Sequence, residues 1–98
     1  MAEPRSVPPA EAWRRLQGGA RLFDLRTRGE RLMFGWPPGS VKVSLVRHRL
    51  RPDAEAIYLC QHAVRSKGPA RHGATEVEGG FVAWKQAGLP ITGGRSKP

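Results

Sequence analysis

The stretch that decides the fold is Ala56-Ile57-Tyr58-Leu59-Cys60-Gln61-His62-Ala63-Val64-Arg65-Ser66. Its first four residues form a short apolar run, which predicts a buried strand, and the small and polar residues after it predict a tight loop that leads into a helix. Cys60 then lies at the carboxyl end of a strand, where open α/β sheets bind their ligands. Backbone N–H groups of such a loop can converge on an anion.

Cys60 is the single cysteine of the chain. A helix N-terminus and a nearby cation such as Arg65 both favour the thiolate, so this position suits a reactive sulfur. A free cysteine is more often a small buried hydrophobic residue, however. The other motifs of the sequence have to decide between the two interpretations.

Four motifs accompany the cysteine. They are the spacing Cys60-x-x-x-x-Arg65-Ser66, the segment Leu22-Phe23-Asp24-Leu25-Arg26-Thr27 with Glu30 after it, the turn Trp36-Pro37-Pro38-Gly39-Ser40-Val41, and the ending Glu78-Gly79-Gly80-Phe81-Val82-Ala83-Trp84 followed by Gly88-Leu89-Pro90-Ile91. In this order, and over residues 22 to 91, they resemble the rhodanese (sulfurtransferase) family. Any one motif alone would be weak evidence.

The resemblance implies a small α/β rhodanese-like domain, with a central, mostly parallel sheet of four to five strands and short helices around it. A chain of 98 residues has room for one domain and one modest core. We therefore expect a single domain over residues 1–91. Residues 92–98 are rich in Gly, Arg and Lys and predict a flexible C-terminal tail.

The resemblance also implies a reaction, in which Cys60 attacks a small anionic sulfur donor, thiosulfate or a persulfide, and becomes a persulfide. The sulfur then passes to a thiol, to a cyanide-like acceptor or to a partner protein, and no cofactor is expected. The expected substrate-binding residues are the rest of the loop, with Arg65 orienting the anionic donor and the others contributing mainly backbone: Gln61, His62, Ala63, Val64 and Ser66. Asp24, Arg26 and Glu30 are expected to support the loop structurally.

The sequence departs from the family at two places. Ala63 stands where the family commonly has Gly, and the poor helix-forming segment from Lys67 to Gly73 predicts a shorter helix after the loop than is usual, of two turns at most. These departures leave a second hypothesis open, a catalytically weak rhodanese-like module that binds a partner or senses sulfur.

Other function classes find less support. Phosphatases with a related loop place five residues between Cys and Arg, whereas Cys60 and Arg65 are separated by four. The net charge of +9 suggests nucleic-acid binding, but the basic residues are scattered and lack interleaved aromatic residues. His48 and His72 have no spacing with Cys60 that predicts a metal site. The absence of a long apolar segment predicts a cytoplasmic protein that does not bind membranes.

Overall fold

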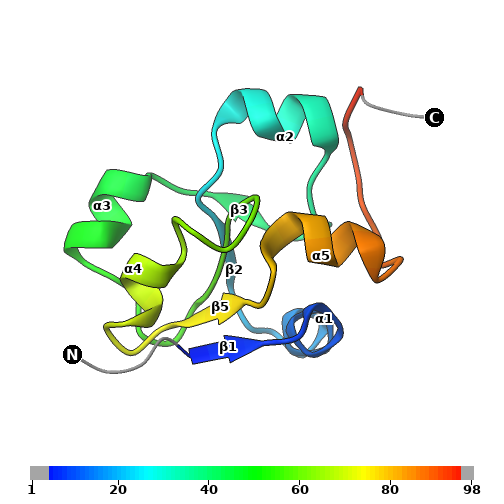
Figure 1. Cartoon of the computed structure of the whole chain (residues 1–98). Helices are drawn as coiled ribbons and strands as arrows, with labels where there is room; N and C mark the ends of the chain where they lie inside the picture. Colours follow the sequence, from blue (N-terminus) through cyan, green and yellow to red (C-terminus); the bar gives the residue numbers. More distant parts are fainter. Residues whose placement is uncertain (1–4, 96–98) are drawn as a thin grey trace.

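The computed structural model describes residues 5–95 of the chain. A five-stranded sheet with parallel pairing throughout lies at its centre, in the order β1-β5-β4-β2-β3. The strands are β1 (Arg5–Val7), β2 (Leu22–Asp24), β3 (Val41–Lys42), β4 (Ile57–Leu59) and β5 (Thr75–Val77). The helices are α1 (Pro9–Gln17), α2 (Arg28–Phe34), α3 (Leu45–Leu50), α4 (Lys67–Ala70) and α5 (Gly80–Gln86) (Figure 1).

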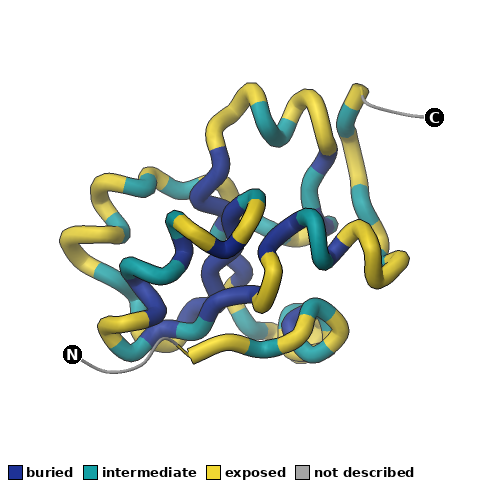
Figure 2. Tube along the Cα trace, viewed as in Figure 1, coloured by how far each residue is buried: buried dark blue, intermediate teal, exposed yellow. Residues whose placement is uncertain are grey.

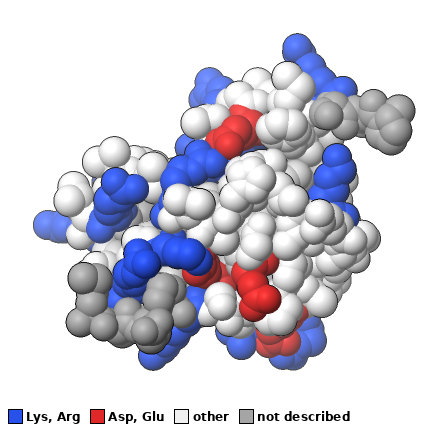
Figure 3. Space-filling model, in the orientation of Figure 1, with Lys and Arg blue, Asp and Glu red and all other residues white. Residues whose placement is uncertain are grey.

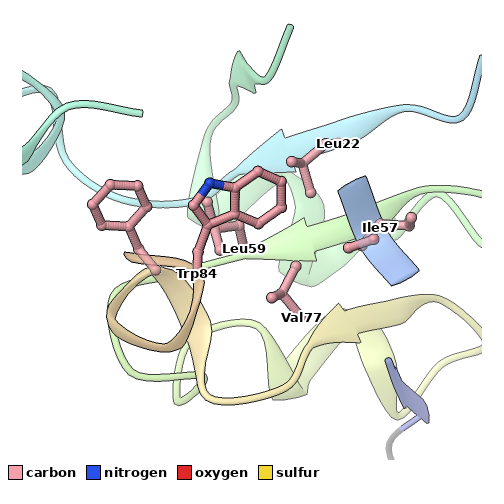
Figure 4. Close-up of a cluster of buried hydrophobic side chains, with 7 residues drawn as sticks. Leu22, Ile57, Leu59, Val77 and Trp84 are labelled. Atoms are coloured by element: carbon pink, nitrogen blue, oxygen red, sulfur yellow. The ribbon is translucent and has the colours of Figure 1, made fainter. Parts of the chain in front are cut away.

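Strand β4 is the middle of the sheet and supplies both faces of the core. Ile57 and Leu59 point to one face, where they pack with Leu22, Val77 and Trp84 (Figure 4). Tyr58 and Cys60 point to the other face. Successive side chains of a strand alternate between faces, so a fully apolar strand with covered faces on both sides is typical of a parallel sheet.

The helices cover the two faces in pairs. Helices α1 and α5 pack on the face of Ile57 and Leu59, where Trp13 and Trp84 meet edge to face with ring centroids 5.8 Å apart. Helices α3 and α4 lie together on the side of Tyr58 (Figure 1). Buried residues accordingly lie at the centre of the molecule, while the helices expose their outer sides (Figure 2). None of the helices described between residues 5 and 95 is long and apolar enough to cross a membrane.

The structure confirms the predicted α/β class. The short connection from β3 to β4 contains the six-residue helix α3, and the two strands are not neighbours, because β2 lies between them. Strand β1 was not predicted, because it is short, mostly exposed and lacks a clear alternation of apolar residues; its pairing with β5 places it at the sheet edge.

The C-terminal segment contacts the domain as far as residue 95. Trp36 and Thr92 exchange two backbone hydrogen bonds of 2.9 Å, and the N–H of Arg95 donates to the Met33 carbonyl at 2.9 Å. The predicted tail therefore begins with residues that are hydrogen-bonded to the end of α2. Residues 96–98 lie outside the described part of the chain.

Candidate active site

The loop that carries Cys60 follows β4 directly, at the carboxyl edge of the sheet, and passes between α4 and α5 in the view of Figure 1. The first turn of α5 packs against this loop and is hydrogen-bonded to it. The N–H groups of Phe81 and Val82 donate to the carbonyls of Cys60 and Gln61 at 2.8 and 3.2 Å. The end of β4 is thus bound to the start of α5 by backbone hydrogen bonds.

Gly80 makes this close approach possible. A Cβ at this position would lie 2.6 to 2.7 Å from backbone atoms of the loop, and the φ angle of Gly80 is +68°. Both the contact distance and the left-handed backbone require glycine. The Gly-Gly pair of the C-terminal motif therefore has a physical function, which is to let α5 begin directly beneath the Cys60 loop.

The sulfur of Cys60 is surrounded by its own loop. The backbone N–H of Val64 donates to Sγ at 3.0 Å, and Oγ of Ser66 lies 3.5 Å from Sγ. Cys60 has no solvent-exposed area. The Val64 N–H is thus a backbone donor for negative charge at the sulfur.

Ala63 adopts a left-handed backbone, with φ at +58°. This is the position at which the resemblance suggested glycine. An L-residue with a side chain pays roughly 1–2 kcal/mol in this conformation because Cβ approaches the following carbonyl oxygen. The loop therefore keeps the turn that a glycine would favour, at some cost in strain.

Arg65 is held by Glu30 at the outer side of the loop. Its Nη1 and Nη2 atoms donate to the two Glu30 carboxylate oxygens, each at 2.8 Å. These bonds lower the pKa of Glu30 to about 2 and raise the pKa of Arg65 above its ordinary value. Glu30 also completes the capping box of α2 with Thr27. The sequence placed Arg65 at the donor site; in the structure this guanidinium is partly exposed and bound to a carboxylate.

A second ion pair, between Asp24 and Arg26, lies beneath the loop and is completely buried. Arg26 donates to both carboxylate oxygens of Asp24, to the Gly35 carbonyl at 2.8 Å and to Oε1 of Gln61 at 3.2 Å. Its guanidinium carbon lies 4.1 Å from the centroid of the Phe81 ring. Arg26 thereby joins β2, the end of α2, the loop and α5.

One buried residue that is linked to the sulfur through Ser66 was missed by the sequence analysis. Glu76 is almost completely buried in β5, and its Oε1 atom accepts a 2.8 Å hydrogen bond from the Ser66 hydroxyl. Its other oxygen accepts from Nζ of Lys67 at 2.9 Å. The available signal was an acidic residue inside a short predicted strand, between Thr75 and Val77.

The remaining loop side chains point outward. His62 is exposed and Val64 is 72% exposed. Beside Gln61 a hollow of about 300 Å³ extends along Phe34, Phe81 and Lys85. Among residues 5–95, no three His, Cys, Asp or Glu side chains are grouped so that they could hold a metal ion.

On the face shown in Figure 3, Lys and Arg side chains lie at several separated places, and Asp and Glu side chains adjoin some of them. The basic charge is thus distributed over this face rather than collected in one block.

Comparison with solved structures identifies the fold. A rhodanese-like domain protein from Staphylococcus aureus superposes with a TM-score of 0.64 at 26% identity, over 90% of this chain and 98% of that one. The chain has the rhodanese-like fold. This confirms the family resemblance that the four motifs indicated.

Other structures share the fold of this rhodanese-like domain. The polysulfide-sulfur transferase homodimer of Wolinella succinogenes matches with a TM-score of 0.69 at 25% identity, over 95% of this chain and 80% of that one. A Rhodopseudomonas palustris protein of unknown function, described as a possible tyrosine phosphatase, matches with a TM-score of 0.76 at 22% identity, over 91% and 85%. No protein-family model and no curated protein sequence matches the chain.

Proposed function

We propose that this rhodanese-like domain is a sulfurtransferase in which Cys60 carries the transferred sulfur. The observation that carries the proposal is the hydrogen bond from the Val64 N–H to Sγ of Cys60, at 3.0 Å, in a loop whose Cys-to-Arg spacing matches the family. A backbone donor aimed at the sulfur favours its anionic forms, thiolate and persulfide. The likeness to a polysulfide-sulfur transferase at 25% identity supports the same chemistry.

The reaction has two steps. The Cys60 thiolate attacks the outer sulfur of thiosulfate, a sulfur–sulfur bond forms at Cys60, and sulfite leaves with the electron pair of the broken sulfur–sulfur bond. A nucleophilic acceptor such as cyanide or a thiolate then attacks the outer sulfur of the persulfide, and the Cys60 thiolate is regenerated. The charges of thiosulfate and persulfide are stabilised by the loop N–H groups.

Access to the sulfur requires movement of the loop, since Cys60 has no exposed area. Val64 and Arg65 form the outer side of the loop, and Arg65 is held there by Glu30. In the proposed reaction this ion pair loosens when an anionic donor competes for the guanidinium. Arg65 would then bind the donor as it enters.

The test is the intact mass of the protein after incubation with thiosulfate. We expect an adduct of one sulfur atom, its loss on adding cyanide with the appearance of thiocyanate, and no adduct in Cys60→Ser. Absence of the adduct with thiosulfate and with polysulfide in the folded protein would overturn the proposal.

The complete burial of Cys60 and the strained alanine at position 63 favour a second candidate, a rhodanese-like module that senses sulfur or binds a partner without turnover. In that case the thiosulfate and cyanide reaction would not exceed the rate of Cys60→Ala. A phosphatase is the weaker candidate, since four residues separate Cys60 from Arg65. Turnover of an aryl phosphate that is lost in Cys60→Ser would favour it.

A further inference from the structure

A hollow of about 220 Å³, here called the α2–β3 pocket, lies apart from the Cys60 loop. Three cationic and two apolar side chains line it: Arg28, Arg31, Leu32, Trp36 and Lys42. The first three are spaced three and four residues apart in α2, so they share one side of the helix. Lys42 belongs to β3, at the edge of the sheet. None of the loop residues 60–66 lines this pocket.

Trp36 forms a fixed wall of the α2–β3 pocket. Its backbone exchanges two hydrogen bonds of 2.9 Å with Thr92. Gly93 packs directly against the indole ring, since a Cβ at this glycine would overlap with carbon atoms of the ring. The guanidinium carbon of Arg31 lies 4.9 Å from the centroid of the ring. The ring thus holds this guanidinium in place, which lowers the entropy that a ligand has to remove on binding.

Arg31 uses little of its hydrogen-bonding capacity within residues 5–95. A guanidinium has five N–H donors, and the structure gives this side chain one hydrogen bond, from Nη1 to Oδ2 of Asp24 at 3.4 Å. Every buried side-chain nitrogen and oxygen of the described residues has a hydrogen-bond partner. The Nε and Nη2 atoms of Arg31 therefore reach the surface, although the side chain is only 13% exposed. The α2–β3 pocket is the hollow that Arg31 lines.

The α2–β3 pocket carries an excess of positive charge. Within residues 5–95, Arg31 is the one of its three cations that forms an ion pair, and its partner Asp24 is buried and already bound by Arg26 at 2.8 Å. Burial lowers the pKa of Arg31 below its ordinary value, an effect that Asp24 opposes and Arg26 reinforces. An anion in the pocket would compensate this charge.

We propose that the α2–β3 pocket binds the phosphate group of a small organic phosphate monoester. Arg28 and Arg31 donate to the phosphate oxygens through their planar guanidinium groups, and Lys42 adds a third positive charge. A phosphate monoester carries a charge of about −1.5 to −2 at neutral pH. This charge matches three cations better than the single charge of a carboxylate does.

The organic part of the ligand lies against the apolar wall of the α2–β3 pocket. Leu32 is 51% exposed there, beside the ring of Trp36. Pockets for drug-sized ligands measure about 300–1,000 Å³, so a pocket of about 220 Å³ fits a smaller molecule, a phosphate with one ring or a short chain. Phenyl phosphate has these properties and is the probe for the test.

The experiment follows the indole N–H signal of Trp36 by NMR while phenyl phosphate is added to the whole chain. The chain has three tryptophans, and the signal that disappears in Trp36→Phe belongs to Trp36. We expect this signal to shift until the site is saturated. The indole N–H of Trp84 donates to the Pro90 carbonyl at 2.8 Å, and its signal is the internal reference that stays in place.

The variants each remove one charge from the α2–β3 pocket. Arg28→Gln and Lys42→Gln change exposed positions, so both are expected to fold. Each is expected to bind phenyl phosphate about tenfold or more weakly, because a hydrogen bond or ion pair to a charged oxygen is lost. Arg71→Gln, the same substitution at an exposed position after α4, is the matched control, and its affinity is expected to stay within about twofold of wild type.

Two further probes test the two parts of the ligand separately. Inorganic phosphate lacks the organic part, and benzoate keeps the ring but carries a single negative charge. Both are expected to bind more weakly than phenyl phosphate. Cys60→Ser is expected to leave the shift of Trp36 unchanged, because the Cys60 loop does not line the α2–β3 pocket.

Four results would overturn the inference. They are a Trp36 signal that shows no saturable shift, an affinity for inorganic phosphate or benzoate equal to that for phenyl phosphate, a loss in Arg71→Gln as large as in Arg28→Gln, and a loss of the shift in Cys60→Ser. The first and third need no substitution at a buried residue. Binding here does not depend on sulfur transfer at Cys60, so this inference and the proposed function can fail separately.

Discussion

Two ion pairs support the Cys60 loop, and they differ in burial. Asp24 and Arg26 are completely buried beneath the loop, whereas the side chains of Glu30 and Arg65 at its outer side are 24% and 27% exposed. A buried charge without its partner is costly, while an exposed pair contributes little to stability because water solvates either ion alone. The difference indicates that the inner pair contributes more to the shape of the site, and that the outer pair, which water reaches, can be broken at a lower cost in free energy.

The largest effect is expected at the inner pair. Arg26→Met leaves the Asp24 carboxylate buried with only Arg31 nearby, at 3.4 Å, and removes the hydrogen bonds to Gly35 and Gln61. We expect a loss of about 3–5 kcal/mol in the free energy of unfolding, measured by urea denaturation. In the control Arg31→Met, Asp24 keeps Arg26, and the loss is expected to be below about 1 kcal/mol. Equal losses of unfolding free energy in the two variants would contradict the conclusion that the Asp24–Arg26 pair is the main support of the site.

The next effect concerns the close packing beneath the loop. Gly80 and Gly88 both have a positive φ, but a Cβ at Gly80 meets backbone atoms at 2.6 to 2.7 Å and one at Gly88 meets nothing within 4 Å. Gly88→Ala is expected to cost roughly 1 kcal/mol in unfolding free energy for its backbone conformation alone. Gly80→Ala is expected to cost about 2 kcal/mol more, since backbone has to shift. If the two variants lose similar amounts of unfolding free energy, the backbone around Gly80 can move to make room for the Cβ.

The outer pair is expected to act through pH. Because the pKa of Glu30 is lowered from 4.5 to about 2, its contribution to stability is fully present above pH 4.5 and is lost as the pH falls toward 2. Glu30→Gln is therefore expected to lower the unfolding free energy by about 1 kcal/mol at pH 7 and by nearly nothing at pH 2. Urea denaturation at the two pH values measures the difference. A loss independent of pH would show that the charge of Glu30 does not cause the effect, since Gln can keep the capping box.

The smallest effect is expected at the strained alanine. Ala63→Gly relieves the cost of a φ of +58° but also raises the entropy of the unfolded chain, so the gain in unfolding free energy is about 0.5 kcal/mol. Ala63→Val, whose branched side chain tolerates this backbone poorly, is expected to lose stability. Thermal denaturation of both variants gives the sign, and a stabilising valine would show that no strain resides at this position.

Much of the fold was predictable because short sequence patterns indicate its strands and helices. The apolar run before Cys60 has the length and composition of a buried strand, and Thr27 with Glu30 has the spacing of a capping box at the start of α2. Strand β1 was not predictable, since its three mostly exposed residues become a strand only through pairing with β5. In the candidate site, Cys60 and Arg65 were predicted because their spacing resembles the family's loop, and their roles stay a prediction. Glu76 was missed because nothing in its own segment indicates that it faces Ser66.

The sequence by itself determined the α/β class, the place of Cys60 at the end of a strand and the loop that follows it, because each depends on residues close together in the chain. Only the tertiary structure decided that Arg65 is bound to Glu30 rather than free, and that Glu76 reaches the sulfur through Ser66. Such contacts arise when separate segments pack side by side. Their chemistry depends on burial and on hydrogen-bond direction, which the order of residues does not contain.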